Sequence, residues 1–301
     1  MLLLATVAAL SIAVGARQLT LTEVWQGLLQ PDSPAYPIVH RMRLPRTLLG
    51  LVAGAALGVT GAAMQALTRN PLADPGLLGI NAGASAAVAT ATALLGVTDV
   101  ADHLWFALLG AAVVTVVGYL VGGGPAATPT RLALAGAALN ATLFSYVNAV
   151  LLLDAATLER LRFWTVGSLA DARTGTVARI LPFVGAGLLL ALLVVRPLGA
   201  LTLGDDAARG LGARPATIRA VVIVAVTLLC GAATAACGPI VFVGLLVPHL
   251  VRALTGPDPR WLLPGCALLA PVLLLGGDVL GRLLGRPGEL QVGLVTAVLG
   301  G

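Results

Sequence analysis

Long apolar runs, separated by shorter polar segments, make up most of the chain. An α-helix needs about 20 apolar residues to cross a hydrocarbon layer about 30 Å thick, and inside lipid its backbone groups must bond within the helix. The runs do not alternate apolar and polar positions, which excludes a β-barrel. The pattern therefore predicts an all-α, multi-pass membrane protein of about ten spans, near residues 1–16, 47–67, 77–97, 104–122, 132–153, 178–196, 217–237, 244–255, 261–281 and 291–301.

Three of these spans are short. Residues 244–255 are too few to cross a bilayer alone, so we expect them to pack inside the protein. Residues 291–301 end with the sequence, and we expect the last helix to be truncated. The first span is short at its beginning and has no basic segment before it, so a signal peptide is not expected.

The polar segments between the spans differ in character. Residues 17–46 form a long polar connection. The loop 122–131 leads into a span, where we expect Thr130 to cap the helix and Arg131 to open it. The charged segment 154–177, which includes a tryptophan, is expected to lie at the membrane interface.

Two sets of glycine and proline residues share the same spacings of 7 and 10 residues. They are Gly54, Gly61 and Pro71, and Gly231, Gly238 and Pro248. Five predicted crossings separate the starts of the two sets, so the repeat halves, near 47–153 and 217–301, should run in opposite directions. Inverted repeats with interrupted helices are typical of transporters, and we interpret residues 1–301 as one transmembrane domain.

Composition supports the membrane assignment and excludes one class of chemistry. Mean hydropathy is +0.98 and only 10% of residues are charged, too few to cover a soluble domain of this length. All 18 basic residues are arginine. Because a phosphate-binding P-loop requires lysine, any ATP that drives this protein must be hydrolysed by another chain. Three cysteines lie in apolar runs, where neither a disulfide nor a metal site is expected; they are Cys230, Cys237 and Cys266.

The segment RLPR at 43–46 places two guanidinium groups at the mouth of a span. Arg43 and Arg46 could simply reach toward the membrane surface, or they could bind carboxylates of a partner protein. Arg282, beside another span end, could belong to the same face.

Two interrupted segments carry the candidate pathway residues. Asn70 and Pro71 break the run that begins at residue 47, and small residues after them favour close helix packing. Packing and pathway lining are equally open for each residue of the segment 69–84, which includes the candidates Asn70 and Pro71. Met64 and Gln65, before this segment, are further pathway candidates. Residues 238–252 form a second break, in which His249 follows Pro248 at a helix start. The histidine is expected to be packed and hydrogen-bonded, with a proton-relay role as the alternative.

The segment 203–214 is amphipathic and charged. Asp205 and Asp206 precede Arg209 by four and three residues, which suits ion pairing within one helix. The segment could be a solvated loop helix or a surface helix that fits a groove on a cytoplasmic ATPase. Asp278 and Glu289 lie near predicted span ends and are expected at the interface, so the buried acid pairs of an ion-driven carrier are not apparent.

Taken together, these segments resemble the FecCD (BtuC-like) family, the permeases of bacterial ABC importers for iron–siderophores, haem and vitamin B12. The resemblance rests on RLPR, GAALGVTGAAMQALTRNPLADPGLLGINAGA at 54–84, FWTVGSL at 163–169, LGDDAARGLGA at 203–213, GPIVFVGLLVPH at 238–249 and GELQVGLVTAVLGG at 288–301. It implies a ten-helix subunit of the inner membrane with cytoplasmic termini. Its implied partners are a second permease, two ATPase subunits and an extracytoplasmic binding protein, with no nucleic acid.

The resemblance also assigns roles to residues. Arg43, Arg46 and Arg282 match the arginines that receive acidic groups of the binding protein. The resemblance implies that the residues which engage the ATPase are Asp205, Asp206, Arg209, Leu211 and Gly212. The resemblance places an inner gate at Thr128, Pro129 and Thr130, although Pro129 stands where some members of the family have a hydroxyl residue.

The leading hypothesis is therefore a permease for a ferric siderophore or related chelate, without enzymatic activity or a cofactor of its own. The alternatives are a haem or vitamin B12 permease, an ion-coupled secondary carrier, and a membrane scaffold or receptor.

Overall fold

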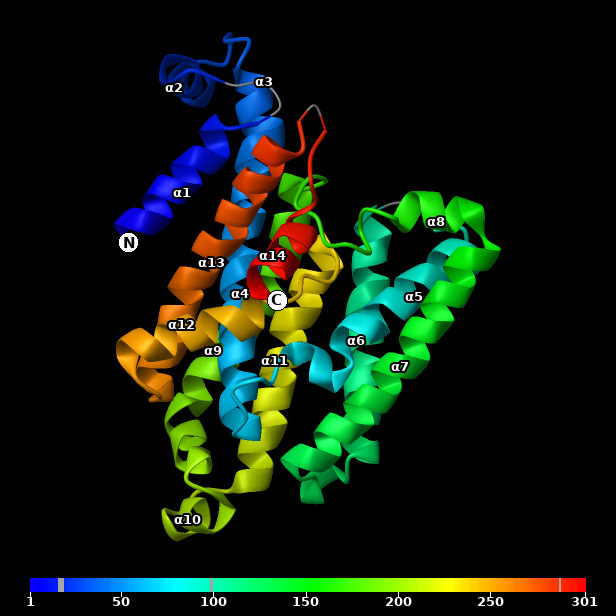
Figure 1. The fold of residues 1–301 in the computed structure, drawn as a ribbon, viewed down its shortest axis with the longest axis vertical. Coiled ribbons are helices and arrows are strands. Elements are labelled where there is room, and N and C mark those ends of the chain that lie inside the picture. Colours follow the sequence, from blue (N-terminus) through cyan, green and yellow to red (C-terminus); the bar gives the residue numbers. More distant parts are fainter. Residues whose placement is uncertain (16–18, 98–99, 287) are drawn as a thin grey trace.

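Ten apolar helices form the bundle in the computed structural model, which describes residues 1–15, 19–97, 100–286 and 288–301 (Figure 1). Six are long enough to cross a membrane: α4 (Leu44–Thr68), α6 (Val100–Val121), α7 (Pro129–Leu153), α9 (Thr174–Thr202), α11 (Pro215–Cys237) and α13 (Pro259–Leu284). Four are shorter: α1 (Leu2–Ala13), α5 (Ile80–Leu94), α12 (Val243–Thr255) and α14 (Val292–Gly300). The all-α, multi-pass fold class is confirmed, and each helix overlaps one predicted span.

The connections contain further helices that the apolar pattern did not predict. They are α2 (Leu21–Leu29), α3 (Tyr36–Ile38), the π-helix η1 (Val39–Arg43), the 3₁₀ turns η2 (Pro75–Leu78) and η3 (Gly124–Ala126), and α8 (Ala155–Leu161). The short helix α10 (Asp205–Gly210) lies within 203–214, where the charge pattern predicts a helix. A sequence signal for α2 did exist. Thr20 and Glu23 form a capping box, in which each side chain bonds the other residue's backbone N–H.

The π-helix η1 joins α3 to α4 and explains the local shape of the RLPR segment. The N–H of Leu44 bonds to the carbonyl of Val39, five residues back. Pro45, which follows, has no N–H to donate and sits in the first turn of α4. The wide turn therefore keeps Tyr36–Thr68 continuous over 33 residues, and such turns often occur at functional sites.

Helix α4 is the centre of the bundle because small residues let its neighbours approach closely. A Cβ built on Gly61 would lie 1.9 Å from the carbonyl oxygen of Gly244 in α12, and one on Gly54 would lie 2.6 Å from the Cα of Pro271 in α13. The most apolar stretch of Tyr36–Thr68 is 78% buried, whereas that of α7 is only 11% buried. Helix α4 is thus enclosed by the rest of the chain, whereas α7 is almost uncovered.

The two proposed repeat halves place their first helices in opposite directions, since α4 and α11 run antiparallel (Figure 1). The matched residues nevertheless differ in local structure. Gly61 lies inside α4, whereas Gly238 ends α11 with a φ of +72°. The expected break in the segment 238–252 is present between α11 and α12, but Pro248 lies inside α12, so its expected position at a helix start is wrong. The duplication itself stays a prediction.

Candidate functional site

The residues with candidate roles lie at both ends of the bundle and along one flank. The arginine cluster lies at the end where α4 begins and α13 ends, and α10 lies at the opposite end (Figure 1). Helix α7 forms the flank between them.

Arg46 and Arg282 share a buried carboxylate. Arg46 donates from Nη2 to Oδ1 of Asp278 at 2.7 Å and from Nη1 to Glu289 at 2.7 Å. Arg282 donates to the other oxygen of Asp278 at 2.5 Å. Asp278 is fully buried in the protein, near the end of α13, and its expected position at the membrane interface stays a prediction. Two positive and two negative side chains thus balance one another where little water reaches.

The same end of the bundle holds the last turn of α1. The final carbonyl groups of a helix have no partner within it and carry its negative dipole end. Arg43 donates from Nη1 to two of these oxygens at 2.6 and 2.7 Å, and Arg282 donates from Nη1 to two others. The four acceptors are the carbonyl oxygens of Ser11, Ile12, Ala13 and Val14. Two arginines therefore fasten α1 to α4 and α13.

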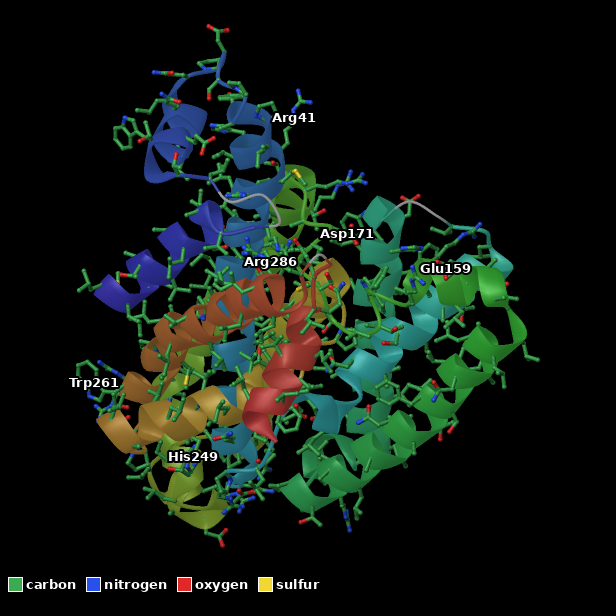
Figure 2. All side chains as sticks on the ribbon, turned by 45° about the horizontal axis from the view of Figure 1, so that its top comes forward. Arg41, Glu159, Asp171, His249, Trp261 and Arg286 are labelled. Carbon is green, nitrogen blue, oxygen red and sulfur yellow. The ribbon has the colours of Figure 1, made fainter. Side chains whose placement is uncertain are left out.

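These contacts bear on the docking prediction. Arg43 is 5% exposed and Arg282 is 2% exposed, and both already bond within the chain. Docking of a partner's carboxylates on Arg43, Arg46 and Arg282 stays a prediction, and for the buried pair it requires that α1 moves. Arg41, in η1, is exposed at this end (Figure 2). Sequence reasoning missed the α1 contacts because backbone carbonyls leave no signature in a sequence.

At the opposite end, the two aspartates of α10 have different partners. Asp206 pairs with Arg209 at 2.7 Å, as the spacing predicts. Asp205 does not pair within the helix: it accepts two bonds from Nη2 of Arg219 in α11, at 2.6 and 2.7 Å. Its other neighbour is Arg69, at 3.9 Å. Asp205 therefore attaches α10 to α11, while the second pair remains at the surface.

The residues that follow α10 form its exposed edge. Leu211 is 68% exposed, and Gly212 turns the chain with a φ of +79°. A large apolar side chain held outward on a short, anchored helix is a suitable contact for another protein. The coupling role of this edge stays a prediction.

Helix α7 is where sequence reasoning missed a candidate surface. Thr142, Ser145 and Asn148 are exposed and follow one another at three-residue spacing, so they lie along one side of the helix. The two hydroxyls bond to carbonyls of their own helix, which leaves the amide of Asn148 as the most costly group to place in lipid. The three-residue spacing of Thr142, Ser145 and Asn148 within an apolar run is the sequence signal that could have identified this surface.

The predicted gate segment lies at the start of α7. Thr128, not Thr130, caps this helix: its Oγ1 accepts the N–H of Arg131 at 3.3 Å. The proposed cap was wrong because Pro129 fits the first helical position, where no N–H is needed. The gate role of Thr128, Pro129 and Thr130 stays a prediction.

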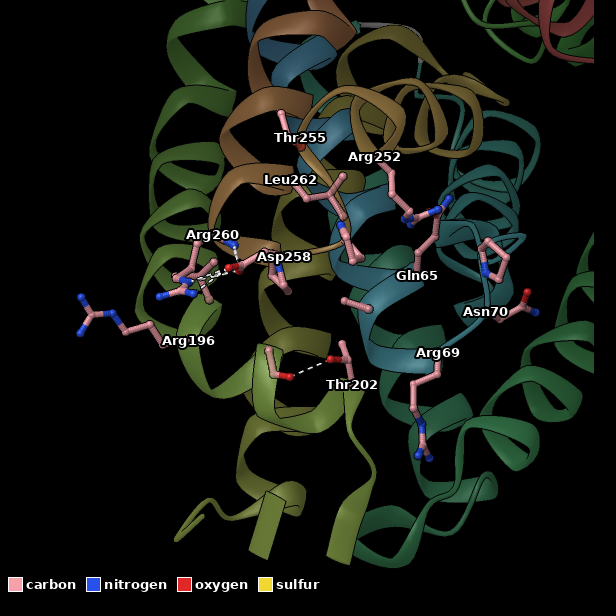
Figure 3. A pocket seen from close by; sticks show the side chains of 16 residues that line it. Gln65, Arg69, Asn70, Arg196, Thr202, Arg252, Thr255, Asp258, Arg260 and Leu262 are labelled. Carbon is pink, nitrogen blue, oxygen red and sulfur yellow. Dashed lines mark hydrogen bonds and ion pairs between the residues drawn. The ribbon is translucent and has the colours of Figure 1, made fainter. Parts of the chain in front are cut away.

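The other pathway candidates separate into different environments. Met64 is buried in the core, and Pro248 is buried inside α12. His249 is exposed, so the expectation of a packed histidine is wrong (Figure 2). Gln65, Asn70 and Pro71 come together at a cavity of about 910 Å³ beside α9, α12 and α13 (Figure 3).

Comparison with known proteins agrees with this architecture. The model of the FecCD transport family matches residues 2–301. The ferric enterobactin transport system permease protein FepD of Escherichia coli (strain K12) is 46% identical over 100% of this chain and 90% of its own length. The hemin transport system permease protein HmuU of Yersinia pestis is 38% identical over 100% of this chain and 91% of its own.

A solved structure extends the likeness to three dimensions. It is an inward-facing conformation of a metal-chelate type ABC transporter, with a TM-score of 0.86 at 25% identity, covering 99% of this chain and 94% of the other. A multi-pass helical bundle, a family match over nearly every residue and this superposition lead to one conclusion: the chain belongs to the FecCD transport family of membrane permeases.

Proposed function

We propose that this chain is the membrane-spanning permease subunit of an ATP-binding cassette importer, which carries a ferric siderophore across the inner (cytoplasmic) membrane by alternating access. A second permease subunit, two ATP-hydrolysing subunits and an extracytoplasmic binding protein complete the transporter. The chain itself performs no covalent chemistry.

The observation that carries the proposal is the uncovered flank of α7. Only 11% of its apolar stretch is buried, yet Ser145 and Asn148 lie on it. Lipid cannot satisfy an amide, so this flank faces a second subunit and the aqueous path between the two subunits. A pathway formed between two copies allows a bulky chelate to pass without a pore through either bundle.

The two ends of the bundle support the remaining assignments. The end with α10 offers the exposed Leu211 on a helix that Asp205 anchors to α11, so force applied there by an ATPase reaches a long helix. The arginine end offers positive charge for acidic groups of a binding protein, first through the exposed Arg41 and then, if α1 moves, through Arg43 and Arg282.

An ion-coupled carrier is the weaker alternative. Such carriers need acidic groups that bind and release ions inside the membrane. Asp278 is fully buried, but its carboxylate forms salt bridges with Arg46 at 2.7 Å and Arg282 at 2.5 Å. Among the described residues, no group of three or more His, Cys, Asp or Glu side chains could hold a metal ion.

The substrate follows from the relatives. The relative named for ferric enterobactin is 46% identical, whereas those named for iron(3+)-hydroxamate, Fe(3+)-citrate and hemin are 32–39% identical. This order favours a ferric siderophore, with haem or a corrinoid as the alternative.

The test is uptake into proteoliposomes that contain the permease, its ATPase subunits and its binding protein. Ferric enterobactin, a ferric hydroxamate and haem serve as competing substrates. We expect uptake of ferric enterobactin. This uptake should depend on ATP enclosed in the liposomes and should not change when ionophores are added. The change Asn148→Leu should lower uptake at least several-fold while the complex still assembles.

Two results would contradict the proposal. Uptake driven by an ion gradient without ATPase subunits would establish a secondary carrier. Full assembly with ATP hydrolysis but no flux of any chelate would indicate a receptor or scaffold.

A further inference from the structure

A basic cavity opens at the α10 end of the bundle, on the side away from α7. The ends of α4, α9, α12 and α13 enclose about 910 Å³ (Figure 3). Four arginines and a single aspartate line it: Arg69, Arg196, Arg252, Arg260 and Asp258. The cavity is much larger than a simple anion needs and lies within the size range of small-molecule sites.

The positive charges of the cavity are incompletely neutralised within the chain. Arg260 is paired, since it donates from Nε and Nη2 to Asp258, and these bonds hold the pKa of Asp258 below its ordinary value. Arg252 donates to the amide oxygen of Gln65 at 2.6 Å and has no carboxylate within 4.0 Å among the described residues. Arg196 also has no carboxylate within 4.0 Å among the described residues, and its side chain points outward in Figure 3.

Exposed apolar residues place the cavity rim at the level of a membrane surface. Trp261, which follows Arg260 in the chain, is 67% exposed at the edge of the molecule (Figure 2). Leu254 is 81% exposed and lies one residue before Thr255, which lines the cavity. Tryptophan concentrates where lipid headgroups meet the hydrocarbon, and basic pockets between helices at that level bind anionic headgroups.

We propose that this cavity binds the phosphate-bearing headgroup of an anionic phospholipid, with Arg252 as the principal ligand inside the cavity, Arg196 contacting the headgroup from the rim, and Arg69 as a third. The phosphate would neutralise the positive charge that has no carboxylate partner among the described residues, while the acyl chains lie against Leu254 and Trp261 at the rim. Gln65 positions Arg252 and links the lipid to α4, the central helix.

The experiment measures lipid binding by the full-length chain purified in detergent. Native mass spectrometry and thermal unfolding are recorded with phosphatidylglycerol, phosphatidylcholine or inorganic phosphate. We expect phosphatidylglycerol to be retained and to stabilise the protein, phosphatidylcholine to do neither, and phosphate to have little effect.

Variants separate the cavity from general surface charge. Each arginine near an anionic headgroup contributes about five-fold, so the double change Arg196→Gln with Arg252→Gln should weaken phosphatidylglycerol binding by about 25-fold. Arg252→Lys should retain most of the affinity. The control is Arg131→Gln, which removes an exposed arginine at the start of α7, outside the cavity, and should change nothing.

Several results would overturn the proposal. Wild-type protein that binds both lipids equally has no anionic site. Equal stabilisation by inorganic phosphate identifies a free anion rather than a lipid. Unchanged lipid binding by the double variant, together with loss of ATPase-subunit binding, assigns the cavity to a protein contact.

Discussion

Replacing Asp278 with asparagine tests whether the buried ion cluster holds the arginine end of the bundle together. The change preserves the size of the side chain and removes one negative charge. Arg46 would keep Glu289 as a partner, but Arg282, whose side chain is 2% exposed, would lose its only carboxylate among the described residues. A guanidinium would then be buried without a counter-charge.

The expected magnitude follows from burial. Removing one partner of a buried pair costs about 3–5 kcal/mol, and the side chain of Asp278 is 1% exposed. Glu289 is 29% exposed, so Glu289→Gln should cost about 1 kcal/mol or less. The two changes therefore form a matched pair in which the same chemistry is altered at different burial. Asp278→Asn combined with Arg282→Met should recover part of the loss, because the unpaired charge is gone.

The assay is equilibrium unfolding in mixed micelles titrated with sodium dodecyl sulfate, followed by circular dichroism. Free energies of unfolding are compared for the wild type, the two single variants and the double variant. The reasoning is refuted if Asp278→Asn lies within 1 kcal/mol of Glu289→Gln, since burial would then not decide the cost.

Three further predictions concern other contacts. Arg43→Gln should release the last turn of α1, seen as faster amide hydrogen exchange there with the rest of the bundle unchanged; equal protection would show that the arginine does not fasten it. Gly61→Ala should prevent close packing of α4 and cost several kcal/mol, whereas Gly185→Ala, with nothing within 4 Å, should be nearly neutral; similar unfolding of both variants would contradict this. Asp205→Asn should lower ATP-driven uptake several-fold by loosening α10, whereas Asp206→Asn at the surface should not, and equal uptake by the two would remove the anchoring role.

Hydropathy was sufficient to place the six long helices because the thickness of a bilayer sets the length of a span. The four shorter helices were found from their apolar runs, although they are too short to meet that length. It could not identify the π-helix before Pro45, since that turn depends on a missing N–H rather than on apolar content. Helix α2 carried a readable capping signal in Thr20 and Glu23.

The candidate sites were harder to predict because pairing depends on which helices meet. Spacing alone allowed Asp205 to pair with Arg209, yet α11 brings Arg219 closer. The arginines of the RLPR segment suggested a partner protein, but the structure gives Arg43 the carbonyls of α1, which any sequence could provide. Burial on α7 also could not be read from the sequence, because it depends on the absence of a neighbouring helix.

The uncovered flank of α7 has a consequence for the supply of the protein in the cell. If α7 packs against a second subunit as proposed, a copy without that subunit holds the amide of Asn148 against acyl chains, which cannot satisfy it and which therefore destabilise the unpaired copy. We therefore expect the lifetime of the chain to follow the abundance of its partner, so that stoichiometry is enforced after synthesis by degradation of the surplus.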